Sequence, residues 1–200
     1  ILVQGTGFLN VTTYWGSGFW DLLAFTTQMA VILAAGYVLA KTPLVDKGLN
    51  KIVSLVHRPR TAVIVATLVG GIGSYLNWGF GLIIGGIVAG KLARKVKGVH
   101  YPLIIAAGYS GFSLYGLGLS GSVPVLISTP GHFMEESMGV IPLSETIFST
   151  PMLLTTLALI ITLPMVNALL HPKNKEEIIE LDPNLVGEEV AATSEPMEKH

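Results

Sequence analysis

SYLNWGFGLIIGG, residues 74–86, is the stretch of the sequence that decides the fold. It lies at the centre of a run of thirty residues, 61–90, that contains no Asp, Glu, Lys or Arg. Such a run is typical of a membrane span, because a spanning helix needs about 20 apolar residues. Its centre, however, carries an amide, an indole and several glycines, which weaken a helix. The stretch therefore predicts that the helix is interrupted at membrane depth.

The composition is typical of a membrane protein. Of the 200 residues, 50% are hydrophobic and only 12% are charged, and the mean hydropathy is +0.63. Soluble domains carry about 25% charged residues, so these values predict an integral membrane protein. The net charge of -1 predicts no nucleic-acid partner, and the lack of cysteine excludes disulfides and thiolate metal sites. Because the chain begins at Ile1, we expect a fragment whose first residues end an earlier apolar segment.

Four uncharged runs are long enough to matter for the membrane topology: residues 22–40, 61–90, 101–134 and 146–170. The first and the last each fit one spanning helix. The two middle runs are too long for one simple span and too short for two. Each of them is therefore expected to contain a break.

The basic residues indicate how the second run is arranged. Of the twelve Lys and Arg residues, five lie within residues 41–60 and four within residues 91–97. Positive charge marks the cytoplasmic side of short loops, so both ends of the run 61–90 are expected in the cytoplasm. A single span cannot satisfy this, but a re-entrant hairpin with its tip at 77–79 can. Its arms, roughly 11 to 16 residues or about 16 to 24 Å, would stop short of crossing a core of about 30 Å.

A second interruption is expected within residues 101–134. Four glycines between 111 and 121 weaken the helix, and Pro124 and Pro130 cannot donate backbone hydrogen bonds. Ser122 followed by Val123 and Pro124 predicts an N-cap with a first-turn proline. Irregular backbone at membrane depth must be buried in protein or line a cavity. Helix N-termini at such breaks favour anions, so two breaks predict a site for a small anion.

The candidate substrate-binding residues come from these two breaks. Asn77 offers amide donors and an acceptor without a net charge, and the glycines let the backbone approach a ligand closely. The competing interpretation is that small residues only serve close helix packing, which we favour for GGIVAG at residues 85–90 but not for the tip. The candidates are Ser74, Asn77, Trp78, Gly79, Gly81, Gly118, Ser120, Gly121, Ser122 and Thr129.

Two further segments complete the domain organisation. Residues 45–56 place five apolar side chains on one stripe, which is typical of a helix in the cytoplasmic interface, with a soluble linker helix as the alternative: Val45, Leu49, Ile52, Val53 and Val56. Residues 172–200 are polar and acidic, and we expect a cytoplasmic linker there. Residues 1–171 are predicted to be the membrane-embedded part.

Four motifs together resemble one family. WGSGFWDLLAFTTQMA, NWGFGLIIGGIVAGKLARKV, YPLIIAAGYSGF and LGLSGSVPVLISTPG occur in the order and spacing of the N-terminal half of bacterial short-chain fatty acid transporters, which include acetoacetate/butyrate permeases. The resemblance covers roughly residues 10–185 and implies that a C-terminal half of similar size is missing. It also implies the ion transporter superfamily, in which inverted repeats each carry a re-entrant hairpin and a broken helix. Related carboxylate transporters carry Ser-Asn-Thr at such tips, where this chain has Leu76-Asn77-Trp78.

The sequence thus predicts an all-α, polytopic protein of the cytoplasmic (inner) membrane that moves short-chain fatty acids such as acetoacetate or butyrate. Its expected partners are the carboxylate substrate, the lipid bilayer and the missing half of the same protein, and a homo-oligomer is a candidate assembly. No cofactor is expected. Na⁺ or H⁺ is a candidate coupling ion, because no Lys or Arg lies inside a predicted span to balance the charge of a carboxylate. The alternatives are a transporter of another organic anion, such as a dicarboxylate, and a channel or structural membrane subunit. An enzyme is not expected, because no acid, base, nucleophile or metal constellation occurs at membrane depth.

Overall fold

The computed structural model describes residues 7–132 and 134–182, and these residues form helices and loops without a strand. The predicted all-α membrane fold is confirmed, because α3, the stretch Tyr101–Ile127 and α8 are each long and apolar enough to cross a membrane. The pair Thr26–Ala40 and Pro43–Ser54, bent by 66°, is a fourth candidate. The helices are α1 (Phe8–Ala40), α2 (Pro43–Ser54), α3 (Pro59–Leu76), α4 (Trp78–Lys95), α5 (Tyr101–Ser110), η1 (Gly111–Leu117), α6 (Ser122–Ile127), α7 (Glu135–Met138), α8 (Thr150–Leu169) and η2 (Lys175–Glu177).

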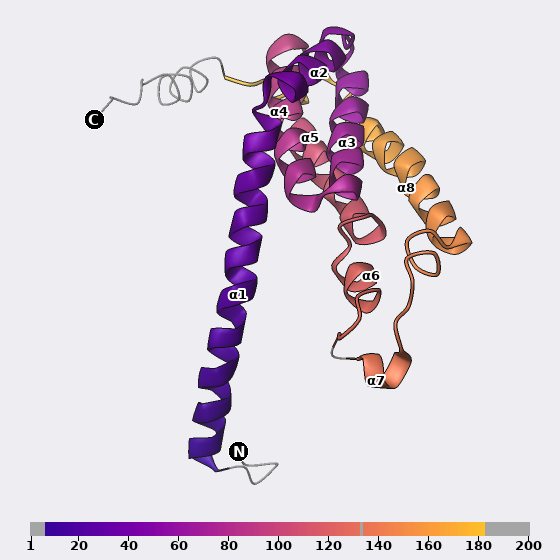
Figure 1. The fold of residues 1–200 in the computed structure, drawn as a ribbon. Helices are drawn as coiled ribbons and strands as arrows, with labels where there is room; N and C mark the ends of the chain where they lie inside the picture. Colours follow the sequence, from indigo (N-terminus) through magenta and orange to yellow (C-terminus); the bar gives the residue numbers. More distant parts are fainter. Residues whose placement is uncertain (1–6, 133, 183–200) are drawn as a thin grey trace.

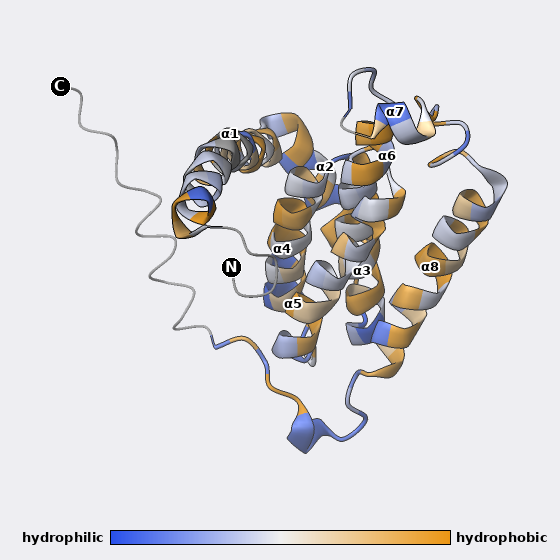
Figure 2. Cartoon of the chain, turned by 90° about the horizontal axis from the view of Figure 1, so that it is seen from below, coloured by the Kyte–Doolittle hydropathy of each residue, from blue (hydrophilic) through white to orange (hydrophobic). Residues whose placement is uncertain are grey.

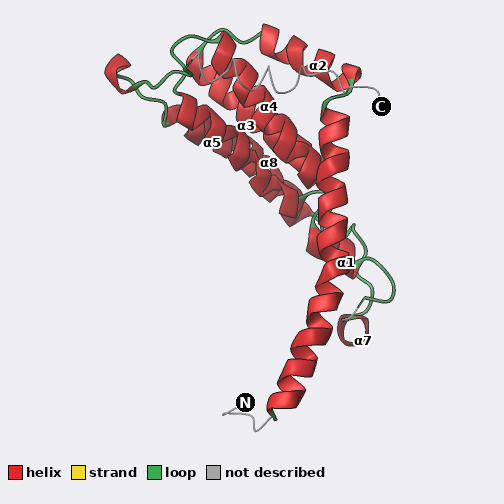
Figure 3. Ribbon diagram, turned by 90° about the vertical axis from the view of Figure 1, so that its left-hand side faces the viewer, coloured by secondary structure: helices red, strands yellow, loops and turns green. Residues whose placement is uncertain are grey.

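Helix α1 is one continuous helix of 33 residues that projects well beyond the other helices (Figures 1 and 3). The uncharged run begins at residue 22, but the helix begins earlier: the backbone is helical from Phe8, because neither Asp21 nor Gly16 and Gly18 interrupts it. A single charged residue does not end a helix, and no proline lies within these residues. At 1.5 Å per residue the helix is about 50 Å long.

Helix α2 lies across the end of α4, as Figure 3 shows. The predicted apolar stripe is borne out at Leu49, Val53 and Val56, which are buried, but not at Ile52, which is exposed. Its polar side is tied to α4, since Lys91 Nζ lies 2.5 Å from Asp46 Oδ1. Lys95 Nζ donates to the carbonyl oxygens of Val53 and Ser54 (2.7 and 2.6 Å), so a cation from α4 satisfies the open C-terminal carbonyls of α2.

Helices α3 and α4 form an antiparallel hairpin connected by the single residue Asn77. Each arm is 18 residues, about 27 Å, which is longer than predicted. The prediction ended α4 near Lys91, but the helix continues through Arg94 and Lys95, whose charges suit a helix C-terminus. The hairpin supplies seven of the fifteen residues of the buried core cluster: Ala62, Val63, Ala66, Ile84, Val88, Ala89 and Leu92.

Helix α5 packs on the hairpin at a point where three backbones meet without side chains between them. A Cβ added to Gly70 or Gly85 would lie 2.3 or 2.8 Å from the carbonyl oxygen of Gly108. Gly85 therefore serves packing, as favoured for residues 85–90, whereas Gly86 and Gly90 have open space beside them. Helix α8 then packs against α3 and leaves an apolar face outside (Figure 2), which carries Leu153, Leu154, Leu157 and Ile161.

Candidate functional site

The tip of the hairpin is built around Asn77. Its backbone is extended (φ -152°, ψ 123°), so it ends α3 and begins α4. Its Oδ1 accepts the N–H of Phe80 at 3.0 Å, which is an N-cap of α4, and its carbonyl accepts the N–H of Gly81 at 2.9 Å. Since the amide oxygen is committed to the cap, the Nδ2 group at this exposed position keeps its two donors for another partner.

The second break follows η1. Helix α5 tightens into this 3₁₀ segment, and residues 118–121 then leave helical geometry before α6 begins. Gly118 is required here, because an added Cβ would lie 2.3 Å from the carbonyl oxygen of Tyr75. The N-cap of α6 is Gly121 and not Ser122 as predicted. Ser122 is already the first helical residue, which places Pro124 in the first turn, where its missing N–H costs nothing.

Ser120 joins the two breaks. Its Oγ accepts the backbone N–H of Trp78 at 2.9 Å and donates to the carbonyl oxygen of Ser74 at 3.2 Å. A backbone hydrogen bond lies beside it, in which the N–H of Leu119 donates to the carbonyl oxygen of Tyr75 at 2.8 Å. The last turn of α3 and the first residue of α4 are therefore both held by the loop between η1 and α6. The structure brings these predicted residues together although they are more than forty positions apart in the chain.

Ser74 and Gly81 face each other inside the hairpin. Ser74 is fully buried, and its Oγ has no hydrogen-bond partner among the described residues. Gly81 leaves the room that this side chain occupies, because a Cβ there would lie 2.3 Å from Ser74 Oγ and 1.9 Å from Ser74 N. A buried hydroxyl without a hydrogen-bond partner lowers the stability of the fold. The packing of the hairpin therefore does not explain why a serine stands at this position next to the tip.

Aromatic rings border the contact between the two breaks. The Trp78 ring meets Phe112 edge-on at 6.4 Å between centroids, and Phe112 stacks on Tyr115 at 4.7 Å and on Tyr109 at 6.0 Å. Trp78 was predicted from the sequence, but Tyr109, Phe112 and Tyr115 were not. Their spacing of three residues was the available signal, because positions i and i+3 eclipse in a 3₁₀ helix. These four rings form an aromatic cluster.

The remaining predicted residues lie elsewhere or serve packing. Gly79 is buried against α1, where an added Cβ would lie 3.0 Å from Cγ2 of Ile32. Ser122 is exposed at the start of α6, and Thr129 is exposed after its end, with its hydroxyl donating to the carbonyl of Val125 at 2.8 Å. Among the described residues, no group of three His, Asp or Glu side chains is placed to hold a metal ion.

A second polar cluster, inside the helix packing, was not predicted from the sequence. Asn167 of α8 is buried, and its Nδ2 donates to Thr67 Oγ1 of α3 at 3.0 Å and to Ser110 Oγ of α5 at 2.7 Å. Both hydroxyls donate onward to carbonyls of their own helices, those of Val63 and Ala107. One amide thus connects three apolar helices. Nothing in the run 146–170 distinguishes a buried Asn from one facing outward, so only the helix packing reveals it.

Comparison with known proteins identifies relatives. The family model described as "Short chain fatty acid transporter" matches residues 1–200. Two curated proteins are each 40% identical to the chain: the "Putative short-chain fatty acid transporter" of Escherichia coli (strain K12) over 181 residues, and a protein of the same name from Haemophilus influenzae (strain ATCC 51907 / DSM 11121 / KW20 / Rd) over 185 residues. The matches cover 90% and 89% of the chain but 41% of each relative, so the chain spans about two fifths of their length. No solved structure matches significantly.

Proposed function

Because the chain belongs to the short-chain fatty acid transporter family, we propose that it binds a short-chain carboxylate, such as acetoacetate or butyrate, where the hairpin tip meets the break after η1. In this proposal the protein is a multi-pass component of the cytoplasmic membrane, and Na⁺ or H⁺ drives the transport. The observation that carries the site is the Ser120 hydroxyl, which bonds to Trp78 N–H and to the Ser74 carbonyl and so brings both breaks to one point.

The carboxylate is held by uncharged donors. No Lys or Arg occurs in residues 61–90 or 98–172, so no cation of these segments pairs with it. Asn77 Nδ2 is the donor best suited to bind the carboxylate, because the oxygen of the same amide, Oδ1, accepts Phe80 N–H and so fixes the orientation of the side chain. The Ser120 hydroxyl positions the tip beside Asn77 and does not donate to the carboxylate, because its one proton is donated to the Ser74 carbonyl. A single negative charge needs fewer donors than a dicarboxylate, which favours a monocarboxylate.

The short acyl chain lies against the aromatic cluster. Phe112 is half-buried between Trp78 and Tyr115, so these rings give an apolar wall next to the polar tip. Each buried CH₂ contributes about 0.8 kcal/mol, and a chain of two or three methylenes therefore gains about 2 kcal/mol there. The curated relatives are longer than this chain. We propose that a segment corresponding to their additional length belongs to the same protein here and closes the site from the other side.

Uptake measurements distinguish substrate binding by Asn77 from its role as the N-cap of α4. Asn77→Ala should abolish uptake of labelled butyrate by cells that contain the protein. Asn77→Ser keeps an N-cap oxygen but removes both Nδ2 donors, so it should also abolish uptake while leaving the amount of membrane protein unchanged. If Asn77→Ser transports like the wild type, Asn77 is only a helix cap and is removed from the binding site.

The same assay, with purified protein in liposomes, tests the substrate and the coupling ion. Unlabelled butyrate and acetoacetate should compete with labelled butyrate, whereas succinate should not. Imposed Na⁺ and pH gradients are applied separately, and one of them should raise the initial rate. Competition by succinate alone would make the protein a dicarboxylate transporter, and unsaturable uptake that ignores both gradients would indicate a channel.

A further inference from the structure

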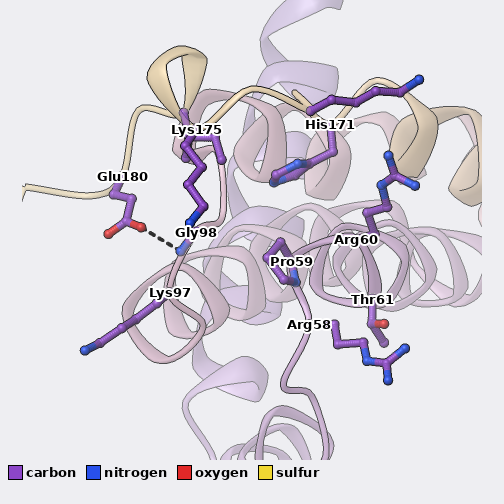
Figure 4. A pocket seen from close by; sticks show the side chains of 11 residues that line it. Arg58, Pro59, Arg60, Thr61, Lys97, Gly98, His171, Lys175 and Glu180 are labelled. Carbon is purple, nitrogen blue, oxygen red and sulfur yellow. Dashed lines mark hydrogen bonds between the residues drawn. The ribbon is translucent and has the colours of Figure 1, made fainter.

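A basic cavity lies at the end of the hairpin opposite its tip (Figure 4). It has a volume of about 880 Å³ and lies between the start of α3, the turn from α4 to α5, and the segment after α8. Five basic side chains line it, with Glu180 as its one acidic residue. Arg58 and Arg60 come from the start of α3, Lys97 from the turn, and Lys173 and Lys175 from the segment after α8.

The walls of the cavity are fixed by hydrogen bonds between segments about eighty residues apart. Tyr101 N–H donates to the carbonyl of Ile179 at 2.7 Å, and Ile179 N–H donates to His100 Nδ1 at 3.1 Å. Glu180 Oε1 accepts the N–H of Gly98 at 2.6 Å, where the chain turns with φ +78°. The first part of the predicted linker is therefore docked on the α4–α5 turn. Docking brings Lys173 and Lys175 to the same opening as Arg58 and Arg60.

The electrostatics of the cavity favour an anion. Five positive side chains and one carboxylate give it a formal charge of +4. Within the described part of the chain, none of the five cations forms an ion pair, and the carboxylate is committed to Gly98 N–H. The first turn of α3 also begins here, after Arg58, and its open N–H groups add positive potential. An α3 of 18 residues separates this cavity from Asn77 by about 27 Å.

We propose that this cavity binds a phosphate-bearing anion. Arginine matches the oxygens of a phosphate with paired donors, and lysine adds point charge. The volume suits a phosphodiester with a small headgroup, since ligand cavities range over about 300 to 1,000 Å³. Pro59 and Ile178 give it an apolar side, and basic pockets at the end of spanning helices are where anionic lipid headgroups bind. A lipid headgroup and free phosphate share this chemistry, so the experiment separates them.

The test measures ligand-induced shifts in unfolding temperature for the purified protein in detergent. The probes are phosphatidylglycerol, phosphatidylcholine and inorganic phosphate. Arg60→Gln/Lys175→Gln removes two charges from the cavity, and Arg58→Gln/Lys173→Gln is a second pair in case the first folds poorly. The matched control is Lys47→Gln/Lys51→Gln, which removes two exposed charges of α2 outside the cavity.

Wild type and control should be stabilised by phosphatidylglycerol or by phosphate, and not by phosphatidylcholine. Both cavity pairs should weaken binding of the effective probe about twenty-five-fold or more, since each of the two basic groups removed contributes about a factor of five or more near an anionic lipid. Stabilisation by phosphatidylglycerol alone identifies a headgroup site, and stabilisation by inorganic phosphate identifies a free-anion site. The proposal is overturned if neither probe stabilises the wild type, or if the control pair weakens binding as much as the cavity pairs do.

Discussion

Two asparagines, Asn77 and Asn167, occupy uncharged segments of this protein, and their surroundings give them opposite roles. Asn77 is exposed at a break, and only its oxygen is committed, to the N–H of Phe80. Asn167 is buried in the last turn of α8, and both hydrogens of its Nδ2 are used, by Thr67 and Ser110. Asn77 therefore has donors left for a ligand, whereas Asn167 holds helices together.

Asn167→Leu tests that structural role. The substitution keeps the approximate volume and removes the two hydrogen bonds, but the hydroxyls of Thr67 and Ser110 keep donating to their own carbonyls. The cost should therefore be about 1 kcal/mol, the usual size for such bonds between membrane helices. Denaturant unfolding in detergent, followed by tryptophan fluorescence, measures it. Thr162→Leu, exposed on the same helix, should leave the midpoint in place; equal midpoints for Asn167→Leu and the wild type would contradict the assignment.

The two breaks were the elements that the sequence predicted best. The position of the hairpin tip followed from basic residues on both flanks of residues 61–90, and Asn77 is the residue that separates α3 from α4. The glycines and prolines likewise located the second break. The sequence did not predict that Ser120 joins the breaks, that Phe112 lies beside Trp78, or that α1 starts at Phe8. The first two features depend on contacts between segments that are far apart in the sequence. The third depends on a helix that continues through one charged residue.

Alanine substitution at two glycines of α4 should change the free energy of unfolding in opposite directions. Gly81→Ala places a Cβ 1.9 Å from Ser74 N, so α3 and α4 must separate, and we expect a loss of about 3 kcal/mol or more in the free energy of unfolding. Gly86→Ala meets nothing within 4 Å and should stabilise the helix by about 0.5 to 1 kcal/mol. The unfolding midpoints of both variants give the comparison. A Gly81→Ala protein as stable as Gly86→Ala would rule out the close approach at the tip.

At the scale of the whole molecule, α1 indicates how deep the tip lies. Ile32 of α1 packs against Gly79 at the tip, nine residues before Lys41. Nine helical residues span about 14 Å, which is about half of a hydrocarbon core of about 30 Å. The other 24 residues of α1, 8–31, extend about 36 Å farther. If Lys41 marks one membrane surface, α1 crosses the bilayer and the tip lies near its middle. A re-entrant arrangement then requires that the hairpin arms, about 27 Å long, are tilted or extend beyond that surface.

Cysteine labelling tests this topology, and these 200 residues suit it because they contain no cysteine. Arg60→Cys and Lys97→Cys lie at the two ends of the hairpin, and both should react with a membrane-impermeant maleimide only in inverted vesicles. Lys97 serves better here than Lys91, which is bonded to Asp46. Ser137→Cys, in the exposed segment between α6 and α8, should instead react in intact, right-side-out vesicles. Labelling of residues 60 and 97 from opposite faces would make α3 or α4 a complete span, and the proposed midplane site at Asn77 would then move to a membrane surface.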